Sequence, residues 1–447
     1  MGREVAELFN EYPFNPTGLH KIIENINAAD IAEAFESSEK ERIIQIYRLL
    51  PKNMAAEVFS FMEPDVQEIV VEALTDDEIG RIVEELFVDD AVDFIEEMPS
   101  NVVKRVLRNV SEDRRNIINL LLQYPEDSAG SIMTTEFVDL KEGASVKDAF
   151  EKIRATGVDK ETIYTCYVVR SDRVLAGVVS VRTLLLANPA DRIGDIMDAS
   201  VVFANTTDDQ EAVADMFRKY GLLSMPVVDK EQRLVGIVTV DDIIEIIEEE
   251  NTEDIERMAA LTPSEEPYLK TGIIVLSRNR IMWLLVLMFS ATITGFIISS
   301  FEDVLVALPA LFAFVPMLMD TGGNAGSQVS ALMIRGMALG EIKFEDIIKV
   351  VWREIRVGLL CGCALGIINF FRVYLFSDGR DALLSITVTV SLIVTVVMAK
   401  TVGCVLPLVA KKCRIDPTVM AAPLITSIVD AAALVFYFYI AKLLMGI

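Results

Sequence analysis

The chain has 447 residues, a formal net charge of −26 and 52% hydrophobic residues, and it is long enough for three or more domains of about 150 residues each. Residues 1–270 contain 56 acidic and 27 basic residues, whereas residues 271–447 contain 11 and 14, so an acidic part precedes a hydrophobic one. The acidic surface argues against a nucleic-acid partner, because binding to phosphates requires a basic patch.

The scarce residue types exclude further classes of function. His20 is the only histidine, which excludes a histidine-based zinc site. The five cysteines suit a reducing compartment, and Cys361 and Cys363 point to different sides of a helix, so they form a poor metal pair. The sequence has no P-loop, no serine–histidine–aspartate set and no cysteine nucleophile with a partner, so we expect a protein that is not an enzyme. The opening MGREVAELFNEYPF lacks the basic and apolar regions of a signal peptide, and we expect the acidic part in the cytoplasm.

Residues 1–127 are predicted to form an acidic, all-α N-terminal domain of short amphipathic helices. Segments such as DVQEIVVEAL and NVVKRVLRNV have apolar residues at helical spacing. Breaks between such segments recur 24 residues apart, at Leu50–Pro51, Leu74–Thr75 and Met98–Pro99. This recurrence predicts a superhelix of helical hairpins.

Residues 128–247 contain a second internal repeat. SIMTTEFVDLKEGASVKDAFEKI resembles DIMDASVVFANTTDDQEAVADMF, with Met133 and Met197 in register, and VLAGVVSVRTLL resembles RLVGIVTVDDII, with Gly177 matching Gly236. Each copy is predicted to form a strand, a helix, two strands and a helix. This pattern resembles a tandem pair of cystathionine-β-synthase (CBS) domains, an α/β fold, with the first repeat at residues 128–190 and the second at 191–247.

The resemblance to CBS pairs implies a nucleotide site. In that family, a strand Ser or Thr and an Asp three residues later often hold the phosphate and ribose of a nucleotide. The second copy has Thr239 and Asp242 at these positions, whereas the first has Ser180 and Thr183. ATP or another adenine nucleotide is therefore implied at Thr239 and Asp242, and the alternative is a regulatory scaffold that binds at most one nucleotide.

Residues 248–272 are predicted to form an acidic connecting, or plug, helix that continues from the second repeat. Residues 241–256 include nine acidic residues, and Ile243, Ile244, Ile246 and Ile247 give the helix an apolar side. Several of these acidic residues are three or four positions apart, and like charges at that spacing destabilise a helix unless something neutralises them. The segment is therefore either a solvated linker at the membrane edge or a helix that cations bridge to the neighbouring acidic domain.

Residues 273–447 are predicted to form an all-α transmembrane domain of five helices. Five hydrophobic segments, at about 281–300, 304–334, 356–376, 383–410 and 418–445, are each long enough to cross about 30 Å of hydrocarbon. The positive-inside rule places the basic loops and the acidic part in the cytoplasm, and an odd number of spans leaves the C-terminus outside. The loops on one side carry Arg278, Arg280, Arg335, Lys343, Lys349, Arg353, Lys411, Lys412 and Arg414, and those on the other carry Glu302, Asp303, Asp378, Arg380 and Asp381.

The second hydrophobic segment contains polar residues that lipid disfavours, in the stretch PMLMDTGGNAGSQVSALMIRG. Inserting an aspartate at the centre of a membrane costs roughly 2.5–3.5 kcal/mol, so we expect this residue to have a function that compensates for the cost. The glycines let another helix or an ion approach the backbone, and the pair Gly322 and Gly323 is predicted to loosen the helix and expose carbonyl oxygens. The residues that share one stripe at helical spacing are Asp320, Gly323, Asn324, Ser327 and Gln328.

The fifth segment carries a second polar stripe, in APLITSIVDAAAL. Thr426, Ser427 and Asp430 share a face, and Pro423 frees a carbonyl oxygen one turn earlier. Both stripes offer oxygen ligands and no soft ligand, which suits a hard cation such as Mg²⁺ or Ca²⁺ better than zinc or copper. The candidate side-chain ligands within the membrane are Asp320, Asn324 and Asp430.

Simpler interpretations of the intramembrane residues stay open. Asp320 is alternatively a helix-end residue at an interface, and Asn324 and Gln328 are alternatively contacts between helices. Lys400, inside the fourth segment, either reaches toward the membrane surface or pairs with a carboxylate, and no role is assigned to it.

The order of an acidic helical domain, a CBS pair, an acidic connecting helix and five spans resembles the MgtE family of magnesium transporters and channels. The motifs DTGGNAGSQ in the second span and PLITSIVDAA in the fifth carry the resemblance, which covers essentially the whole chain. It implies a homodimer in the lipid bilayer, with an ion pathway along the two-fold axis that the second and fifth spans line. It identifies Asp430 with the pore-binding aspartate and Gly323 with a carbonyl that faces the ion or its water shell, while Ser327 stands where some members have Asn.

The resemblance also implies regulatory Mg²⁺ ions between the helical domain, the CBS pair and the plug helix. At high cytosolic Mg²⁺ these ions would hold the acidic domains together and close the pore, and at low Mg²⁺ repulsion between carboxylates would open it. Gly221 departs from the pattern, since some members have Asp there. The matching acidic residues are Glu57, Asp89, Asp93, Asp209, Glu211, Asp242, Glu245, Glu250, Glu253 and Asp254.

Three functions therefore compete. The main hypothesis is a magnesium-selective channel or transporter that moves Mg²⁺ into the cell. A broader carrier of Co²⁺, Mn²⁺ or Ca²⁺ would use the same ligand chemistry. A nucleotide-sensing CBS regulator in the membrane would have no need for polar stripes in two separate spans.

Overall fold

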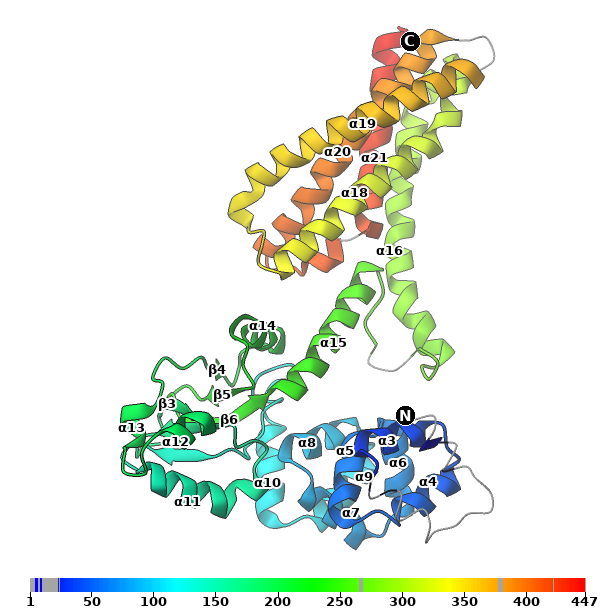
Figure 1. Cartoon of the computed structure of the whole chain (residues 1–447). Coiled ribbons are helices and arrows are strands. Elements are labelled where there is room, and N and C mark those ends of the chain that lie inside the picture. The colour runs from blue at the N-terminus through cyan, green and yellow to red at the C-terminus, as the bar shows by residue number, and fades with distance from the viewer. Residues whose placement is uncertain are drawn as a thin grey trace. The chain divides into compact units, whose positions relative to one another are not determined.

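The structure is a computed structural model that describes residues 5, 6, 9, 23, 25–264, 268–376, 381–420 and 422–446 (Figure 1). The chain divides into Met1–Ile247, which we call the acidic unit, and Glu248–Ile447, which we call the hydrophobic unit. His20, Asp378 and Arg380 lie outside the described residues.

The N-terminal part of the acidic unit is a stack of helical hairpins around a hydrophobic core. Its helices are α3 (Ala28–Glu36), α4 (Lys40–Tyr47), α5 (Lys52–Ser60), α6 (Pro64–Ala73), α7 (Asp76–Glu85), α8 (Val88–Glu97), α9 (Ser100–Asn109) and α10 (Glu112–Leu121). The first helices of successive hairpins have the N-cap residues Asn27, Pro51, Thr75 and Pro99, which are 24 residues apart. The predicted all-α hairpin domain is thereby confirmed.

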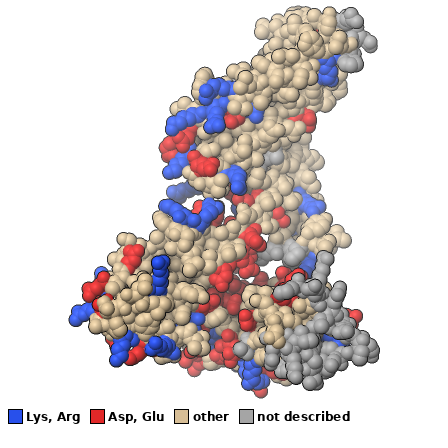
Figure 2. Space-filling model, viewed as in Figure 1, with Lys and Arg blue, Asp and Glu red and all other residues tan. Residues whose placement is uncertain are grey.

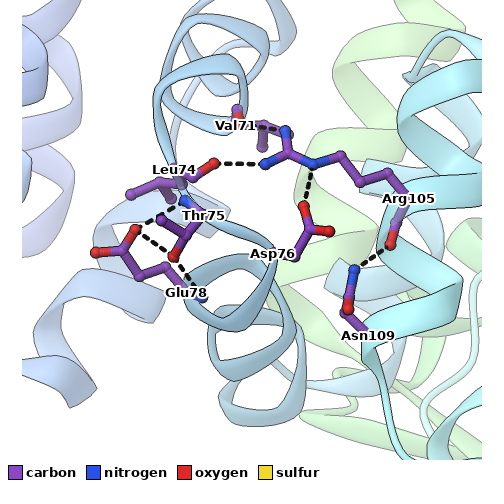
Figure 3. Close-up of polar contacts among 7 residues, drawn as sticks. All are labelled: Val71, Leu74, Thr75, Asp76, Glu78, Arg105 and Asn109. Atoms are coloured by element: carbon purple, nitrogen blue, oxygen red, sulfur yellow. Dashed lines mark hydrogen bonds and ion pairs between the residues drawn. The ribbon is translucent and has the colours of Figure 1, made fainter.

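Arg105 of α9 ties two neighbouring hairpins together (Figure 3). Its guanidinium donates to the carbonyl oxygens of Val71, at 3.1 Å, and Leu74, at 2.5 Å, at the end of α6. Its Nε lies 2.5 Å from Oδ1 of Asp76, beside the capping box that Thr75 begins at the start of α7. One side chain thus adds donors to two carbonyl groups at the end of a helix, where backbone donors are scarce.

The rest of the acidic unit contains the predicted pair of α/β repeats. The first has β1 (Asp139–Lys141), α11 (Val146–Thr156), β2 (Thr165–Val169), β3 (Leu175–Ser180), α12 (Val181–Leu186) and α13 (Ile193–Ile196). The second has β4 (Ala204–Asn205), α14 (Gln210–Tyr220), β5 (Ser224–Val228), β6 (Leu234–Thr239) and α15 (Val240–Met258). In each sheet the first strand pairs parallel with the second, and the second pairs antiparallel with the third. The predicted element order of a CBS pair is confirmed.

The two repeats interlock through the residues that the sequence places in register. A β-carbon on Gly177 of β3 would lie 2.6 Å from Sδ of Met197, at the start of the second repeat. A β-carbon on Gly236 of β6 would lie 2.5 Å from Sδ of Met133, at the start of the first. Each methionine therefore covers a glycine of the other repeat, and a side chain at either glycine would displace it.

The apolar side of α15 is narrower than predicted. Ile243 and Ile246 are buried in the core of the acidic unit, whereas the side chain of Ile244 is 57% exposed. The helical period places positions 243 and 246 on one face and turns position 244 away from it.

The hydrophobic unit contains the long apolar helices. They and their connections are α16 (Ile273–Ser300), α17 (Glu302–Ala307), η2 (Pro309–Phe314), α18 (Val315–Ala338), η3 (Phe344–Asp346), α19 (Ile347–Phe376), α20 (Ala382–Lys412), η4 (Pro417–Met420) and α21 (Ala422–Met445). Among the described residues, four stretches are long and apolar enough to cross a membrane, namely α16, Phe344–Leu375, α20 and Pro417–Met445. The more polar α18 is a fifth long helix outside that set, so the number of five spans stays a prediction.

The second predicted span, residues 304–334, is not one helix. The short helix α17 ends at Ala307, and the 3₁₀-helix η2 begins at Pro309, before α18 starts at Val315. Proline cannot donate a backbone hydrogen bond, so an α-helix cannot run through Pro309 without losing one. The polar stripe therefore lies on α18 alone.

Glycines set the close crossings between the long helices. A β-carbon on Gly358, Gly362 or Gly366 of α19 would lie 3.1–3.2 Å from the nearest atom of α20. On the other side of α20, a β-carbon on Gly403 would overlap the carbonyl oxygen of Gly326 in α18. Small residues thus let α20 pack closely against two neighbours, as is common within membranes.

Candidate functional site

The surface of the hydrophobic unit is mostly uncharged, and Figure 2 shows lysines and arginines gathered near one end of its helices. α18 ends there, α19 begins there and α20 ends there. The exposed basic residues at this end are Arg335, Lys343, Lys349, Arg353, Arg356, Lys411, Lys412 and Arg414.

Polar side chains follow one exposed face of α18. Asp320, Asn324 and Gln328 are four residues apart and exposed, whereas the glycines between them lie on the buried face. Asp430 of α21 is half-buried, and the carboxyl group of Asp320 acts on it electrostatically. The fold therefore brings the two intramembrane carboxyl groups of one chain into the same neighbourhood.

The glycine pair does not loosen α18, contrary to the prediction. The helix runs without a break from Val315 to Ala338. A β-carbon on Gly322 would lie 2.8 Å from Cγ2 of Thr395, and one on Gly323 would lie 2.9 Å from Cγ2 of Thr426. The carbonyl oxygen of Gly323 accepts a hydrogen bond from Ser327 Oγ at 2.8 Å. The glycines make room for α20 and α21, and close packing compensates for the weak helix propensity of glycine.

The hydroxyl groups of α21 are fixed by the proline that precedes them. Thr426 Oγ1 donates to the carbonyl oxygen of Pro423 at 2.9 Å, and Ser427 Oγ donates to the same oxygen at 3.2 Å. The sequence predicted a free carbonyl oxygen at Pro423, but this oxygen accepts both hydrogen bonds. Both hydroxyl oxygens still have lone pairs that can accept a hydrogen bond or bind a cation. The helix that carries Asp430 therefore offers further acceptors for a cation or its water.

Lys400 lies inside α20 and is 7% exposed. Its Cδ lies 3.5 Å from the position of a β-carbon on Gly358, so its stem packs across α19. Glu354, one turn earlier on α19, is 9% exposed. Lys400 is thus a buried contact between α20 and α19.

In the acidic unit, carboxyl groups from three segments come together around α8. Asp89 and Asp90 lie in the first turn of that helix, Asp242 lies in the first turn of α15, and Glu161 lies between α11 and β2. Burial, and then the charge of Asp242, raises the pKa of Asp90 to about 7 and that of Glu161 to about 8. The same causes raise the pKa of Asp89, which is 7% exposed, well above its ordinary value. These groups resist joint ionisation unless a cation neutralises them.

Two members of this cluster, Asp90 and Glu161, are not among the predicted ligands. Asp90 adjoins a predicted ligand in the run of acids, but Glu161 reaches the cluster only through the packing of the first repeat against α8. Its Oε2 is buried and has no hydrogen-bond partner among the residues that the structure describes. In the part of the chain that the structure describes, no three acidic, cysteine or histidine side chains are arranged to hold a bare metal ion. The cluster suits a cation that keeps its water, as Mg²⁺ tends to do.

The other predicted ligands of the acidic unit divide into two groups. Asp93 and Glu245 lie beside the cluster, and Glu245 contributes to the charge that acts on it. Glu57 is exposed on α5, and Asp209 is the N-cap of α14, where its Oδ1 accepts from the backbone of Glu211 at 3.0 Å. These last three are not among the main charges that act on the cluster.

Gly221 has a structural reason to be glycine. It ends α14 with a φ of +63°, in the left-handed region that glycine adopts without strain. An aspartate at this helix end would be less favourable, so the departure from the family pattern agrees with the local backbone.

A second group of acidic residues lies in the hydrophobic unit, at the end of α15. Glu253 forms an ion pair with Arg257, and Arg257 Nη1 lies 2.5 Å from Oδ2 of Asp416, between α20 and η4. Burial, followed by the charges of Asp416 and Glu250, raises the pKa of Asp254 to about 6. Burial also acts to raise the pKa of Asp416, but hydrogen bonds, including one from Arg257, hold it below its ordinary value. One predicted metal ligand, Glu253, therefore already has a cationic partner.

The two predicted nucleotide ligands bind each other. Thr239 Oγ1 donates to Asp242 Oδ2 at 2.5 Å, and Asp242 also belongs to the acidic cluster. The matching position of the first repeat instead borders a pocket of about 500 Å³, in which Arg182 supplies the positive charge that a phosphate requires. The pocket is lined by Ser180, Arg182, Thr183, Leu186, Ala187, Asn188, Asp191 and Ile196.

Family models match most of the chain. The MgtE model, described as a divalent cation transporter, matches residues 315–440, and the MgtE intracellular N domain matches residues 26–127. The CBS domain model matches twice, at residues 129–189 and 193–249.

Curated proteins with similar sequences extend over nearly the whole chain. The magnesium transporter MgtE of Thermus thermophilus is 36% identical over 432 residues, which cover 96% of this chain and 95% of that protein. The magnesium transporter MgtE of Bacillus subtilis is 31% identical over 420 residues, which cover 94% of this chain and 92% of that protein.

Solved structures resemble about half of the chain. The cytosolic domain of the Mg²⁺ channel MgtE in complex with ATP matches with a TM-score of 0.50 and 36% identity, over 52% of this chain and 95% of that one. The soluble part of a magnesium transporter matches with a TM-score of 0.53 and 29% identity, over 56% of this chain and 99% of that one.

Proposed function

The chain belongs to the MgtE family of magnesium transporters, and from this premise we propose that it moves Mg²⁺ across the cytoplasmic membrane into the cell. Transport in this family is not enzymatic, and the apolar helices together with the N-terminal domain fit a membrane protein with a soluble part. The observation that carries the proposal is the packing of α18 against α21, with Gly323 on Thr426, so that Asp320 of one helix acts electrostatically on Asp430 of the other.

The ion pathway follows from the exposed polar face of α18. Asp320, Asn324 and Gln328 would be costly against lipid, and a second copy of the chain would cover them. In a homodimer the stripe and its symmetry mate face each other across the two-fold axis, with both copies of Asp430 nearby. Carboxylates, amides and hydroxyls then offer the acceptors that a hydrated Mg²⁺ needs, since the ion gives up its water reluctantly.

Uptake of Mg²⁺ by liposomes that contain the purified protein tests this proposal. Asp430→Asn keeps the side-chain shape and removes the charge, so uptake should fall to near the level of empty liposomes. Asp303→Asn, an exposed acid of α17, is the matched control and should leave uptake unchanged. Competition with Co²⁺, Mn²⁺ and Ca²⁺ distinguishes a magnesium-selective pathway from a broader one. Full uptake by Asp430→Asn would reject the assignment of the pathway.

The acidic residues outside the pathway are proposed to close it when cytosolic Mg²⁺ is high. The cluster around α8 contains carboxyl groups that oppose one another's ionisation, and a cation relieves that opposition. Mg²⁺ would thus favour the conformation in which these groups are close. Patch recordings of a variant with Glu253→Gln and Asp254→Asn should show weaker inhibition by cytosolic Mg²⁺, and an unchanged inhibition curve would contradict the role of the plug helix.

The CBS pair is proposed to bind an adenine nucleotide. The related cytosolic domain was solved with ATP, and the pocket beside Ser180 has space, with Arg182 as a cation that can contact a phosphate and Asp191 as an acceptor on the same lining. ATP titration of Arg182→Ala and Asp242→Asn locates the site. Loss of affinity only in the first variant places it in the first repeat, and loss only in the second places it at Thr239 and Asp242.

The proposed topology has five spans in each protomer, the acidic domains in the cytoplasm and the C-terminus outside. The domain limits follow the predicted ones, with the plug segment at residues 248–272 and the pore domain at 273–447. The helical part of the plug segment is shorter than predicted, because α15 ends at Met258. Labelling of a cysteine introduced at Gly446 by an impermeant reagent on whole cells tests the outside position.

A further inference from the structure

Arg257 places a fixed positive charge between two carboxylates of the hydrophobic unit. It lies in the last turn of α15, with Glu253 one turn earlier and Asp416 beyond the end of α20. The three side chains are 39%, 30% and 29% exposed, respectively, so the contact is partly shielded from water. A guanidinium holds two carboxylates at once through its planar fork of donors, which an ammonium group lacks.

Asp416 connects this contact to the helices that carry the intramembrane carboxyl groups. Its Oδ2 faces Arg257, while its Oδ1 accepts from the backbone nitrogen of Thr418 in η4 at 2.8 Å. Thr418 is 3% exposed, and η4 leads into α21. At the other end of η4, the carbonyl oxygen of Met420 accepts from Ser330 Oγ of α18 at 3.1 Å. Polar contacts at both ends of η4 thus connect the end of α15, through the chain of η4, to α18.

We propose that Arg257 is a built-in cation that holds the end of α15 on η4 without any divalent ion. The inference rests on the proposed Mg²⁺ transport and its control by cytosolic Mg²⁺. A free Mg²⁺ ion could join Glu253 and Asp416 only when its concentration is high, whereas a guanidinium of the same chain is always present. The bridge therefore favours the conformation in which α15 lies on η4 at any Mg²⁺ concentration, and Mg²⁺ bound to the remaining carboxylates adds to that preference. Arg257 is a positioning residue, since it acts on the pathway through η4.

A double-mutant cycle in EDTA tests the bridge directly on the full-length protein in detergent. Arg257→Gln and Asp416→Asn should each lower Tm by about 2–4 °C, the shift for about 1 kcal/mol in a region of this size. Asn keeps an oxygen for the backbone of Thr418, so both variants should fold. The double variant should lose no more than the worse single one, and additive losses would overturn the proposal. Arg353→Gln, an exposed arginine of α19, is the control that should not change Tm.

Loss of the guanidinium alone separates the bridge from simple packing of the arginine stem. Arg257→Met keeps an apolar stem, so it should lower Tm as much as Arg257→Gln does if the charge forms the bridge, whereas a packing role would leave Tm near that of the wild type. In liposomes, Arg257→Gln should raise the internal Mg²⁺ concentration that halves uptake by about fivefold, the factor for about 1 kcal/mol. Arg257→Lys should cause a smaller shift. An unchanged half-inhibiting concentration in Arg257→Gln would also overturn the proposal.

The two readouts keep this proposal distinct from the proposed function. If the wild-type protein takes up no Mg²⁺, the proposed transport is rejected, and if its uptake does not depend on internal Mg²⁺, the proposed control is rejected. In both cases the double-mutant cycle in EDTA would still test whether Arg257 and Asp416 form the bridge. Additive losses together with normal Mg²⁺-controlled uptake would reject only the role of Arg257.

Discussion

Where α18 crosses α20, two glycines bring helix backbones into direct contact. A β-carbon on Gly403 would overlap the carbonyl oxygen of Gly326, and one on Gly326 would lie 3.3 Å from the carbonyl oxygen of Ala399. Backbone atoms cannot turn aside as the end of a side chain can. The position of α18, and with it that of Asp320, therefore depends on single residues that carry no functional group.

Gly403→Ala should separate these helices. Overpacking of this kind costs about 1–3 kcal/mol, so we expect a lower Tm and reduced Mg²⁺ uptake, because α18 shifts relative to α21. Thermal unfolding of the full-length protein in detergent and uptake by liposomes measure the two effects. Gly295→Ala on α16, where a β-carbon meets nothing within 4 Å, is the control and should not lower Tm, since alanine favours a helix more than glycine does. A Gly403→Ala protein as stable as wild type would contradict this account.

Single residues also show where sequence reasoning stops. Helical spacing places Asp320 and Asn324 on one exposed face, because that prediction needs only the period of α18. The contribution of Glu161 to the acidic cluster depends on how the first repeat packs against α8, and no local pattern contains that information. The same holds for Arg257 and Asp416, which are 159 positions apart in the chain.

At the scale of elements, the stability of the helical-hairpin stack depends on the contacts that join one hairpin to the next. At the end of α6, the carbonyl oxygen of Val71 accepts a long backbone hydrogen bond of 3.4 Å from Leu74, and Arg105 of α9 donates to the carbonyl oxygens of both residues (Figure 3). The same guanidinium contacts Asp76 at the start of α7. The 24-residue period is therefore stabilised by a contact between hairpins as well as by the shared core.

Arg105→Met should loosen the stack at this joint. The side chain is about one-third exposed, and loss of its hydrogen bonds should cost about 2 kcal/mol, which corresponds to about 30-fold faster amide exchange. Hydrogen exchange of α6 and α7 in the full-length protein measures the change. Arg108→Met, an exposed arginine on the same helix, should leave exchange unchanged. Equal exchange in both variants would show that the core alone sets the stability of the joint.

Elements could be predicted from the sequence wherever a period or a repeat defines them. The 24-residue breaks mark the starts of helices at Pro51, Thr75 and Pro99, and the internal match of Gly177 with Gly236 marks two equal repeats. The interlocking of those repeats, in which each methionine covers a glycine of the other, depends on tertiary packing. Hydropathy alone also missed the break at Pro309, because an apolar run stays apolar when its helix is interrupted.

At the scale of the whole molecule, the chain concentrates negative charge in its acidic part and places some of it where burial opposes ionisation. The cluster around α8 has Arg114 as a nearby cation, and that arginine is engaged by Glu136 at 2.9 Å. The carboxyl groups of the cluster have one another as neighbours, and the charges of Asp241 and Glu245 also act on it. Without a divalent cation, the acidic unit therefore has a stability that depends on protons.

In EDTA, the acidic unit should become less stable as the pH rises from about 5 to about 8. Asp90 and Glu161 have folded-state pKa values of about 7 and about 8, whereas carboxyl groups of an unfolded chain titrate near about 4. Between these values the folded state binds more protons than the unfolded one, so stability falls with pH, by at most about 1.4 kcal/mol per pH unit for each group. Protection factors of α8 amides, which correct exchange for its intrinsic pH dependence, measure this slope in the full-length protein.

Saturating Mg²⁺ should remove the slope, because the ion binds the deprotonated carboxylates and takes over the role of the protons. A variant with Asp90→Asn and Glu161→Gln should show a reduced slope in EDTA, while Glu57→Gln, an exposed acid of α5 in the same unit, should keep the full slope. Protection that rises with pH in EDTA would mean that the folded cluster releases protons more readily than the unfolded chain. The carboxyl groups would then be stabilised as anions by the protein itself, and they would have no need of a metal ion to stay together.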